Sequence, residues 1–111
     1  MRKIEQKICN AIVENTHMSA QNTICVSNAD NTIIELFLHG YKIFQFDRVN
    51  KTFKWNDYDW TTKTTASRLN AAFEAMKRLG IGNYRYTYKI KGDGKVYDYN
   101  AKERVERELN F

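Results

Sequence analysis

The sequence predicts a single α+β domain, in which a mostly antiparallel sheet packs with a central helix and short terminal helices. Two segments have apolar residues at helical spacing, several shorter segments alternate apolar and polar residues, and turn-forming residues separate the shorter segments. The 111 residues suffice for one hydrophobic core, and a chain with 42% hydrophobic residues and no proline shows neither a linker nor a disordered tail. We therefore expect one domain over residues 1–111, with the element order α-ββββ-α-ββ-α.

The first half of the chain predicts a short helix followed by a four-stranded meander. Apolar residues lie at helical spacing near the N-terminus, at Ile4, Ile8, Ala11 and Ile12. Apolar and polar residues alternate in four later segments, at 23–27, 32–38, 41–48 and 52–55. His39 and Gly40 predict a tight hairpin turn, because glycine accepts the positive φ that such turns need. Asn50 and Lys51 predict another two-residue turn.

The second half predicts a longer helix, an aromatic hairpin and a short closing helix. From Thr64 or Thr65 onward the apolar residues recur at helical spacing, and Gly80 is suited to end this helix. The apolar face of the helix comprises Leu69, Ala72, Phe73, Met76 and Leu79. A tyrosine-rich hairpin follows, with Tyr84, Tyr86 and Tyr88 on one face and Arg85, Lys89 and Lys91 on the other. We expect the tyrosines to pack against the helix. Charge pairs such as Glu103 and Arg107 predict a short helix in the tail 101–111.

The composition argues against a membrane or secreted protein. The longest apolar run, residues 33–38, contains Glu35 and is far shorter than the roughly 20 residues of a membrane span. The N-terminal segment lacks the apolar centre of a signal peptide. We expect a cytoplasmic protein with no membrane partner, in which Cys9 and Cys25 are buried free thiols.

The net charge of +5 is unevenly distributed along the chain. Residues 42–97 carry twelve Lys and Arg side chains against five carboxylates, or +7, whereas the segments on either side each carry −1. A basic region of this kind attracts nucleic acid or an acidic protein surface. A solvated surface that keeps the protein soluble explains the same excess, so both interpretations remain open.

No motif indicates a metal site, a cofactor or a small-molecule ligand, and we expect none of the three. His17 and His39 lack a ligand spacing, and no phosphate-cradling glycine loop is present. Gly92-Asp93-Gly94 could present backbone N–H groups to an anion, but a hairpin turn is favoured. Asp57 and Asp59, two residues apart, could hold a divalent cation with His39 as a base. We favour an exposed charge pair in a turn, and expect a protein without enzymatic activity.

The segment Trp60–Asn70, WTTKTTASRLN, has five hydroxyl side chains where the hydrophobic period changes. Thr64 or Thr65 would serve as the helix N-cap, which contributes ~1 kcal/mol. A cap needs only one hydroxyl, so the remainder, with Lys63, Arg68 and Asn70, suggest either a loop latch or a contact with a phosphate or an acidic partner. The candidate residues for partner or phosphate binding are Lys63, Arg68, Asn70, Arg85, Lys89, Lys91 and Lys95.

The strand-turn and helix-start patterns together resemble a group of small phage-encoded proteins with the pattern L-H-G … W-x-T-x-T-T-x-x-R-L-N. The matching residues lie within 23–90 and are Leu38, His39, Gly40, Trp60, Thr62, Thr64, Thr65, Arg68, Leu69 and Asn70. The resemblance implies a phage or prophage accessory protein. Small proteins of that kind often act stoichiometrically on a host target, including defence systems such as CRISPR complexes.

Three functional hypotheses follow. The first is a binding protein whose basic middle region engages a host protein or ribonucleoprotein. Inhibition of a host defence complex is one activity that such binding could have. The second is a protein that binds DNA or RNA directly through a basic sheet face. The third is a small metal-dependent nuclease using Asp57, Asp59 and His39. The oligomeric state stays open.

Overall fold

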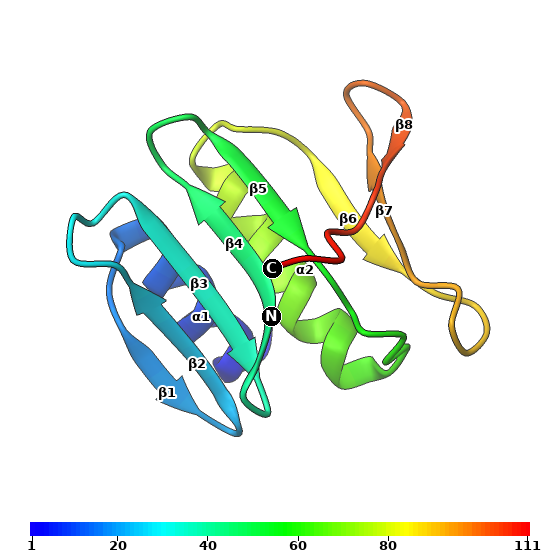
Figure 1. The fold of residues 1–111 in the computed structure, drawn as a ribbon, viewed down its shortest axis with the longest axis horizontal. Helices are drawn as coiled ribbons and strands as arrows, with labels where there is room; N and C mark the ends of the chain where they lie inside the picture. Colours follow the sequence, from blue (N-terminus) through cyan, green and yellow to red (C-terminus); the bar gives the residue numbers. More distant parts are fainter.

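The computed structural model describes all residues 1–111 and confirms the α+β fold class (Figure 1). Helix α1 (Lys3–Glu14) comes first. Five strands follow: β1 (Met18–Ala20), β2 (Thr23–Ser27), β3 (Ile33–Leu38), β4 (Tyr41–Asp47) and β5 (Thr52–Trp55). Helix α2 (Lys63–Arg78) is followed by β6 (Tyr84–Thr87), β7 (Lys95–Asp98) and β8 (Glu103–Val105).

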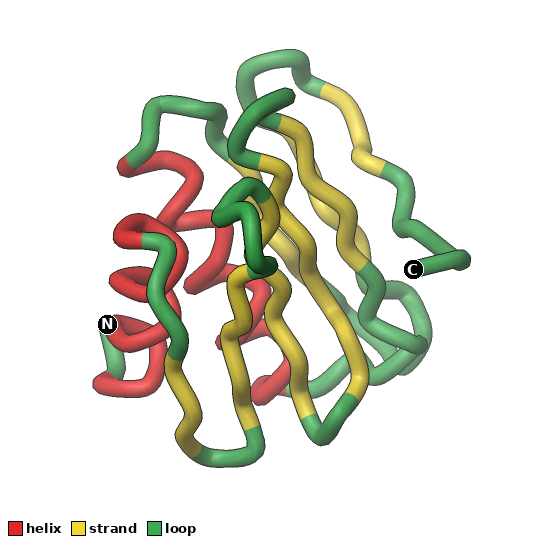
Figure 2. The backbone as a smooth tube through the Cα atoms, turned by 60° about the vertical axis from the view of Figure 1, so that its left-hand side comes forward, coloured by secondary structure: helices red, strands yellow, loops and turns green.

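The strands form two antiparallel sheets, and the helices lie on one side of them. Strands β1 to β5 make a five-stranded sheet in sequence order, and β6, β7 and β8 make a separate three-stranded sheet. Figure 2 shows both helices on the same side of the larger sheet. Helix α2 packs against α1 and against β6, so it joins the two sheets.

The core lies between the helices and the larger sheet. On β3 the alternate residues Ile34, Leu36 and Leu38 are buried, and they face the apolar sides of the two helices. Burying a side chain of this size stabilises the fold by about 1.5–3 kcal/mol. The aromatic residues continue the core toward the smaller sheet, because Phe53 contacts both Phe73 of α2 and Tyr84 of β6.

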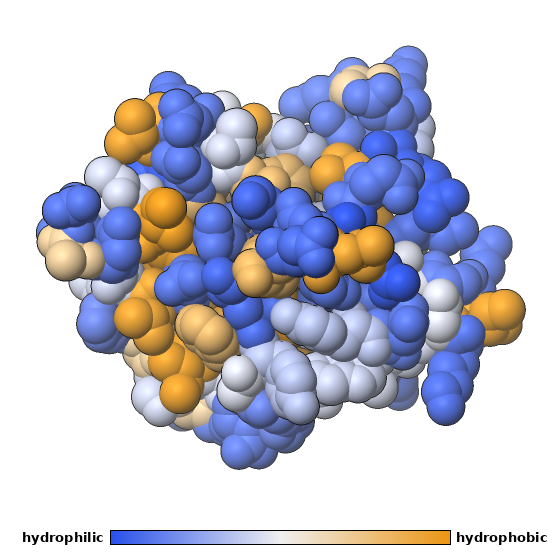
Figure 3. All heavy atoms as spheres, in the orientation of Figure 1, coloured by the Kyte–Doolittle hydropathy of each residue, from blue (hydrophilic) through white to orange (hydrophobic).

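The other face of the larger sheet is only partly covered. Ile24 and Phe37 are paired across β2 and β3 on this face, and Ile24 is exposed. Figure 3 shows hydrophobic residues gathered over this side of the sheet. The C-terminal tail crosses the same face farther along: the Glu108 N–H donates to the Trp55 carbonyl (2.7 Å), and Phe111 lies 5.0 Å from the Lys42 ammonium.

Several turn and cap predictions are confirmed, with one shift. His39 and Gly40 have φ of 53° and 82°, as a two-residue hairpin turn requires. Gly80, with φ of 75°, follows the end of α2. The N-cap of α2 is Thr62 rather than Thr64 or Thr65, and its hydroxyl accepts a hydrogen bond from the Thr65 N–H at 3.1 Å.

The predicted closing helix is wrong. Residues 103–105 form strand β8, and the rest of the tail has no helix. Tertiary contacts outweigh the helix preference of the local charge pairs. Val105 pairs with β7, and its carbonyl accepts a hydrogen bond from the Trp55 indole at 3.0 Å. Arg107 forms ion pairs with Asp57 and Asp59 instead of Glu103.

Two strand predictions also need correction. The meander has five strands, because the short β1 pairs with β2 through a turn at Gln21 and Asn22, both with positive φ. The turn between β4 and β5 spans residues 48–51 rather than two residues, and the Asp47 carboxylate accepts hydrogen bonds from the Val49 and Asn50 N–H groups.

The hairpin of β6 and β7 has a longer connection than predicted. Thr87 pairs with Lys95, so residues 88–94 form a seven-residue loop. The Asp93 carboxylate accepts from the Lys89 and Ile90 N–H groups and closes this loop. Lys89 and Lys91 therefore lie in the loop and do not share a sheet face with Arg85.

Cys9 and Cys25 are both free and buried, as predicted.

Neither helix has the combination of length and apolar character needed to cross a membrane.

Candidate functional site

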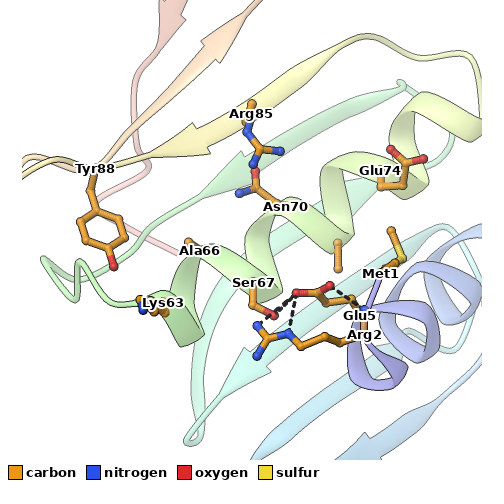
Figure 4. Close-up of a pocket in the computed structure, with 11 residues that line it drawn as sticks. Met1, Arg2, Glu5, Lys63, Ala66, Ser67, Asn70, Glu74, Arg85 and Tyr88 are labelled. Atoms are coloured by element: carbon orange, nitrogen blue, oxygen red, sulfur yellow. Dashed lines mark hydrogen bonds and ion pairs between the residues drawn. The ribbon is translucent and has the colours of Figure 1, made fainter.

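A groove of about 540 Å³ lies where the start of α1, the outer side of α2 and strand β6 meet (Figure 4). We call it the basic groove. Its small floor residues Ala66, Ser67 and Ala71 come from successive turns of α2. Around them stand Met1, Arg2, Glu5, Lys63, Asn70, Glu74, Arg85 and Tyr88. The groove thus combines three segments that are far apart in the sequence.

The rim of the basic groove carries charges of both signs. Lys63 and Arg85 are exposed, and neither makes a salt bridge in this structure. Glu5 pairs with Arg2 at 3.2 Å, and Glu74 pairs with Arg78 at 3.7 Å. The two unpaired cations therefore dominate the field on the side of the groove nearest β6.

A partly buried polar network links α1 to α2 at the groove and extends to Arg68 beneath it. The Ser67 hydroxyl donates to the Glu5 carboxylate at 2.6 Å and accepts from the Arg68 guanidinium at 3.1 Å. Arg68 also donates through Nε to the Thr23 hydroxyl of β2 at 3.0 Å, and the residue is only 5% exposed. Arg68 is therefore an internal latch between α2 and the sheet, and it does not line the groove.

The ionisation of Glu5 follows from this network. Burial alone would raise the pKa of the Glu5 carboxyl, but hydrogen bonds from Ser67 and Arg2 outweigh burial and lower the pKa below its ordinary value. A carboxylate with a lowered pKa is a poor general base toward the Ser67 hydroxyl. The Ser67 and Glu5 pair is thus suited to holding the helices together.

Asn70 attaches helix α2 to strand β6. Its side-chain amide donates to the Tyr86 carbonyl at 3.0 Å, and its oxygen accepts from the Tyr86 N–H at 2.8 Å. The side chain thereby takes the place of a neighbouring strand along the edge of β6. Asn70 also lines the groove, and its two bonds position the backbone of β6 at Tyr86, next to Arg85.

The tyrosines pack against the α2 side as predicted. Tyr86 is 1% exposed, and its hydroxyl donates to the Asp57 carboxylate at 2.6 Å. Burial, followed by this hydrogen bond, raises the pKa of Tyr86 above its ordinary value. A Cβ at Gly94 would collide with the Asp57 carboxylate and the Tyr86 hydroxyl, which accounts for glycine at that position. Tyr88 is half-buried, and its hydroxyl points toward Lys63 in Figure 4.

The two carboxylates considered for a metal site are held by one cation. Arg107 lies 3.2 Å from Asp57 and 2.7 Å from Asp59, and these hydrogen bonds raise the pKa of Arg107, the one to Asp59 most of all. Asp57 is 2% exposed, in contrast to the exposed turn charge that was expected. No three histidine, cysteine, aspartate or glutamate side chains gather where they could hold a metal ion.

The structure separates the seven predicted binding residues. Lys63, Asn70 and Arg85 line the basic groove, and Arg68 is buried beneath it. Lys89 and Lys91 line a neighbouring hollow, and Lys95 lines another one near Arg104. The cationic sheet face expected from the alternation of Arg85, Lys89 and Lys91 is absent, because β6 ends at Thr87.

Most hydroxyls of the segment 60–70 have structural partners. Thr61 accepts from the Gly92 N–H at 2.9 Å, Thr62 caps α2, and the Thr62 and Thr65 hydroxyls lie 3.0 Å apart. Thr64 alone is exposed without a bonded partner. The hydroxyl cluster is thus a loop latch and helix cap.

Sequence reasoning missed Arg2, Glu5 and Glu74 as groove residues. At the start of α1 the Glu5 carboxylate accepts hydrogen bonds from the Arg2 backbone N–H (3.0 Å) and from the Arg2 guanidinium (3.2 Å), and the three-residue spacing of the two residues could have indicated this local role. Their position beside Lys63 depends on the packing of α1 against α2, for which the sequence offers no local signal.

Comparison with known families identifies the group to which the chain is related. The family model described as "Kyanoviridae Gp96 protein" matches residues 1–106. The chain belongs to the Kyanoviridae Gp96 protein family. The family is a phage family, as the resemblance implied. The resemblance covered residues 23–90 only, whereas the family match also includes α1 and strands β6 to β8. No curated protein and no solved structure matches the chain.

Proposed function

We propose that this phage protein is a non-enzymatic binding protein that acts stoichiometrically on a host protein or ribonucleoprotein, and that the basic groove receives a protein surface of the host partner. Inhibition of a host defence complex, such as a CRISPR effector, is one activity that binding of this kind would give. Membership of a phage family supports action inside an infected host cell.

The convergence of Lys63 and Arg85 on one groove is the observation that carries the proposal. The two cations come from α2 and from β6, and both are exposed and free of salt bridges. Unpaired cations on a rigid frame are available to a partner without first breaking an internal ion pair. The bonds from Asn70 to Tyr86 and from Ser67 to Glu5 provide that frame.

The charge pattern of the groove favours a protein partner. Glu5 and Glu74 line it together with Arg2, Lys63 and Arg85. Both carboxylates have cationic partners in this protein, but they interrupt the row of cations that a nucleic-acid backbone, with negative charge at every phosphate, would need to follow. A protein surface can place acidic and basic groups opposite such a mixed pattern.

Affinity capture of the tagged full-length protein from host lysate, with and without nuclease treatment, tests the proposal. We expect a host protein to be recovered in a fixed ratio to the bait, and to remain bound after nuclease. Recovery of nucleic acid alone, with no protein retained after nuclease, would contradict the proposal.

A further inference from the structure

Three hollows lie in series around the N-terminal end of α2, and aromatic residues connect them. The first, of about 480 Å³, is lined by His39, Tyr41 and Trp60. The second, of about 300 Å³, is lined by Trp60 and Tyr88. The third is the basic groove, which Tyr88 also lines. Trp60 thus lines both the first and the second hollow, and Tyr88 lines both the second hollow and the basic groove.

The aromatic side chains of this series are at least partly accessible. Tyr41 is 53% exposed, and Trp60 and Tyr88 are half-buried. Tyr41 meets Trp60 edge to face at 5.0 Å, and Trp60 packs on Tyr58 at 5.3 Å. These contacts hold the Trp60 ring in a defined orientation.

Cations accompany the aromatic residues at the second hollow. Lys89 and Lys91 line it from the loop after β6, and both are exposed. The Thr61 hydroxyl holds this loop beside Trp60 by accepting from the Gly92 N–H. The one carboxylate of this hollow, Asp59, is bonded to Arg107 at 2.7 Å, so its charge is compensated.

We propose that these residues form a site for single-stranded nucleic acid. We name Tyr41, Trp60, Tyr88, Lys89 and Lys91 the aromatic tract. Bases stack on aromatic side chains while cations follow the phosphates, and this combination is typical of sites for single strands. A duplex keeps its bases stacked on each other and cannot offer them to rings that line separate hollows. The site lies beyond the proposed host-protein contact, shares only Tyr88 with it, and does not depend on it.

Binding of labelled twelve-nucleotide oligo(dT) and oligo(U) to the full-length protein, followed by fluorescence anisotropy at several salt concentrations, tests the site. We expect saturable binding to these strands, with weaker binding to a twelve-base-pair duplex. Trp60→Leu should weaken binding at least about 5-fold, because stacking on one aromatic residue contributes that much or more. Trp60→Phe should largely retain binding.

Replacement of the tract cations gives a second readout. The double variant Lys89→Ala and Lys91→Ala should weaken binding and reduce the slope of log K against log salt by about 1.4, since each phosphate contact on a single strand contributes about 0.7. Matched controls are Lys7→Ala on α1 and Tyr99→Ala beyond β7, both exposed and outside the tract. The controls should bind as the wild type does.

Tryptophan emission of the unmodified protein tests the nucleic-acid site even if a variant fails to fold. Trp55 is 2% exposed, so a stacked base can reach only Trp60 and should quench its emission as oligonucleotide is added. Absence of saturable binding at low salt, unquenched emission on binding, or unchanged affinity in folded tract variants would each overturn the site. If host protein is still captured after nuclease in that case, only the nucleic-acid site fails and the proposed function stands.

Discussion

Arg68 illustrates how a cation in a basic segment can be wholly structural. Its guanidinium bonds Thr23 of β2 and Ser67 of α2, and the residue is almost fully buried. Burial is the main cause that lowers the pKa of Arg68 from its ordinary value, with a smaller opposing effect from Glu5. An arginine with these partners contributes to the position of α2 on the sheet, and its charge is not offered to a ligand.

Substituting Arg68 by alanine should therefore destabilise the protein. The change leaves the buried Thr23 hydroxyl without its donor and opens a cavity, so we expect a loss of about 1–3 kcal/mol in the free energy of unfolding. Urea denaturation followed by circular dichroism measures this loss. Lys77→Ala on the exposed side of the same helix should change stability by less than about 0.5 kcal/mol. An unchanged unfolding midpoint for Arg68→Ala, with loss of partner binding, would assign Arg68 to the interface instead.

Glu5 should make stability depend on acid pH. Its folded-state pKa lies below the ordinary value of 4.5, so its contribution is complete above that value and is lost as pH falls through the folded-state pKa. Glu5→Gln should therefore flatten the fall in stability below about pH 5, as measured by urea unfolding at a series of pH values. Glu14→Gln, at the exposed end of α1, is the control. Equal pH profiles for wild type and Glu5→Gln would contradict the network of Arg2, Glu5 and Ser67.

Among the secondary-structure elements, the side chain of Asn70 makes two hydrogen bonds from α2 to the smaller sheet, beside the packing of Phe73 on Tyr84. Asn70 satisfies both backbone groups of Tyr86, so strand β6 is bonded to β7 on one side and to a helix side chain on the other. The contact between Tyr84 and Phe53 adds aromatic packing between β6 and β5, although the two strands belong to different sheets.

Asn70→Ala should loosen this junction. The Tyr86 N–H and carbonyl would lose their partners, which costs about 1–3 kcal/mol when such groups are buried. Hydrogen exchange should show faster exchange of the Tyr86 amide, while the amides of β3 keep their protection. Unchanged exchange at Tyr86 would mean that the strand does not need the helix to hold it.

The sequence predicted the elements that depend on local patterns. Helical periodicity located both helices, alternation located β2 to β7, and the His39 and Gly40 turn followed from the chemistry of glycine. Strand β1 was missed because three residues are too few to show a period. The tail was assigned to a helix because its composition favours one, whereas Trp55, Asp57 and Asp59 hold it in an extended form.

The candidate site was less predictable than the fold. Lys63, Asn70 and Arg85 were chosen because of their residue types, and the structure does bring these three to one groove. The other four residues lie elsewhere for reasons that a local sequence pattern does not indicate. Arg68 is buried, and β6 ends at Thr87. Lys89 and Lys91 line one neighbouring hollow, and Lys95 lines another. Arg2 enters the groove only because α1 packs against α2.

In the whole molecule, the two proposed binding surfaces meet around the first turns of α2. The basic groove carries charges of both signs, and the aromatic tract combines accessible rings with uncompensated cations. A host ribonucleoprotein offers both a protein surface and exposed nucleic acid, so one small phage protein could contact both components of such a target. The charge of +7 in residues 42–97 would accelerate the approach to an acidic target and would make such an association sensitive to salt.

Charge reversal within the basic groove tests whether the groove binds a host protein, as proposed. Tagged wild type, the double variant Lys63→Glu and Arg85→Glu, and the control Lys7→Glu would each be used to capture proteins from nuclease-treated host lysate, after thermal melts show that all three are folded. Quantitative mass spectrometry then compares the recovered proteins. We expect one host protein that wild type and the control recover equally and that the double variant loses at least about tenfold. Equal recovery of that protein by the folded double variant would show that the basic groove is not its binding site.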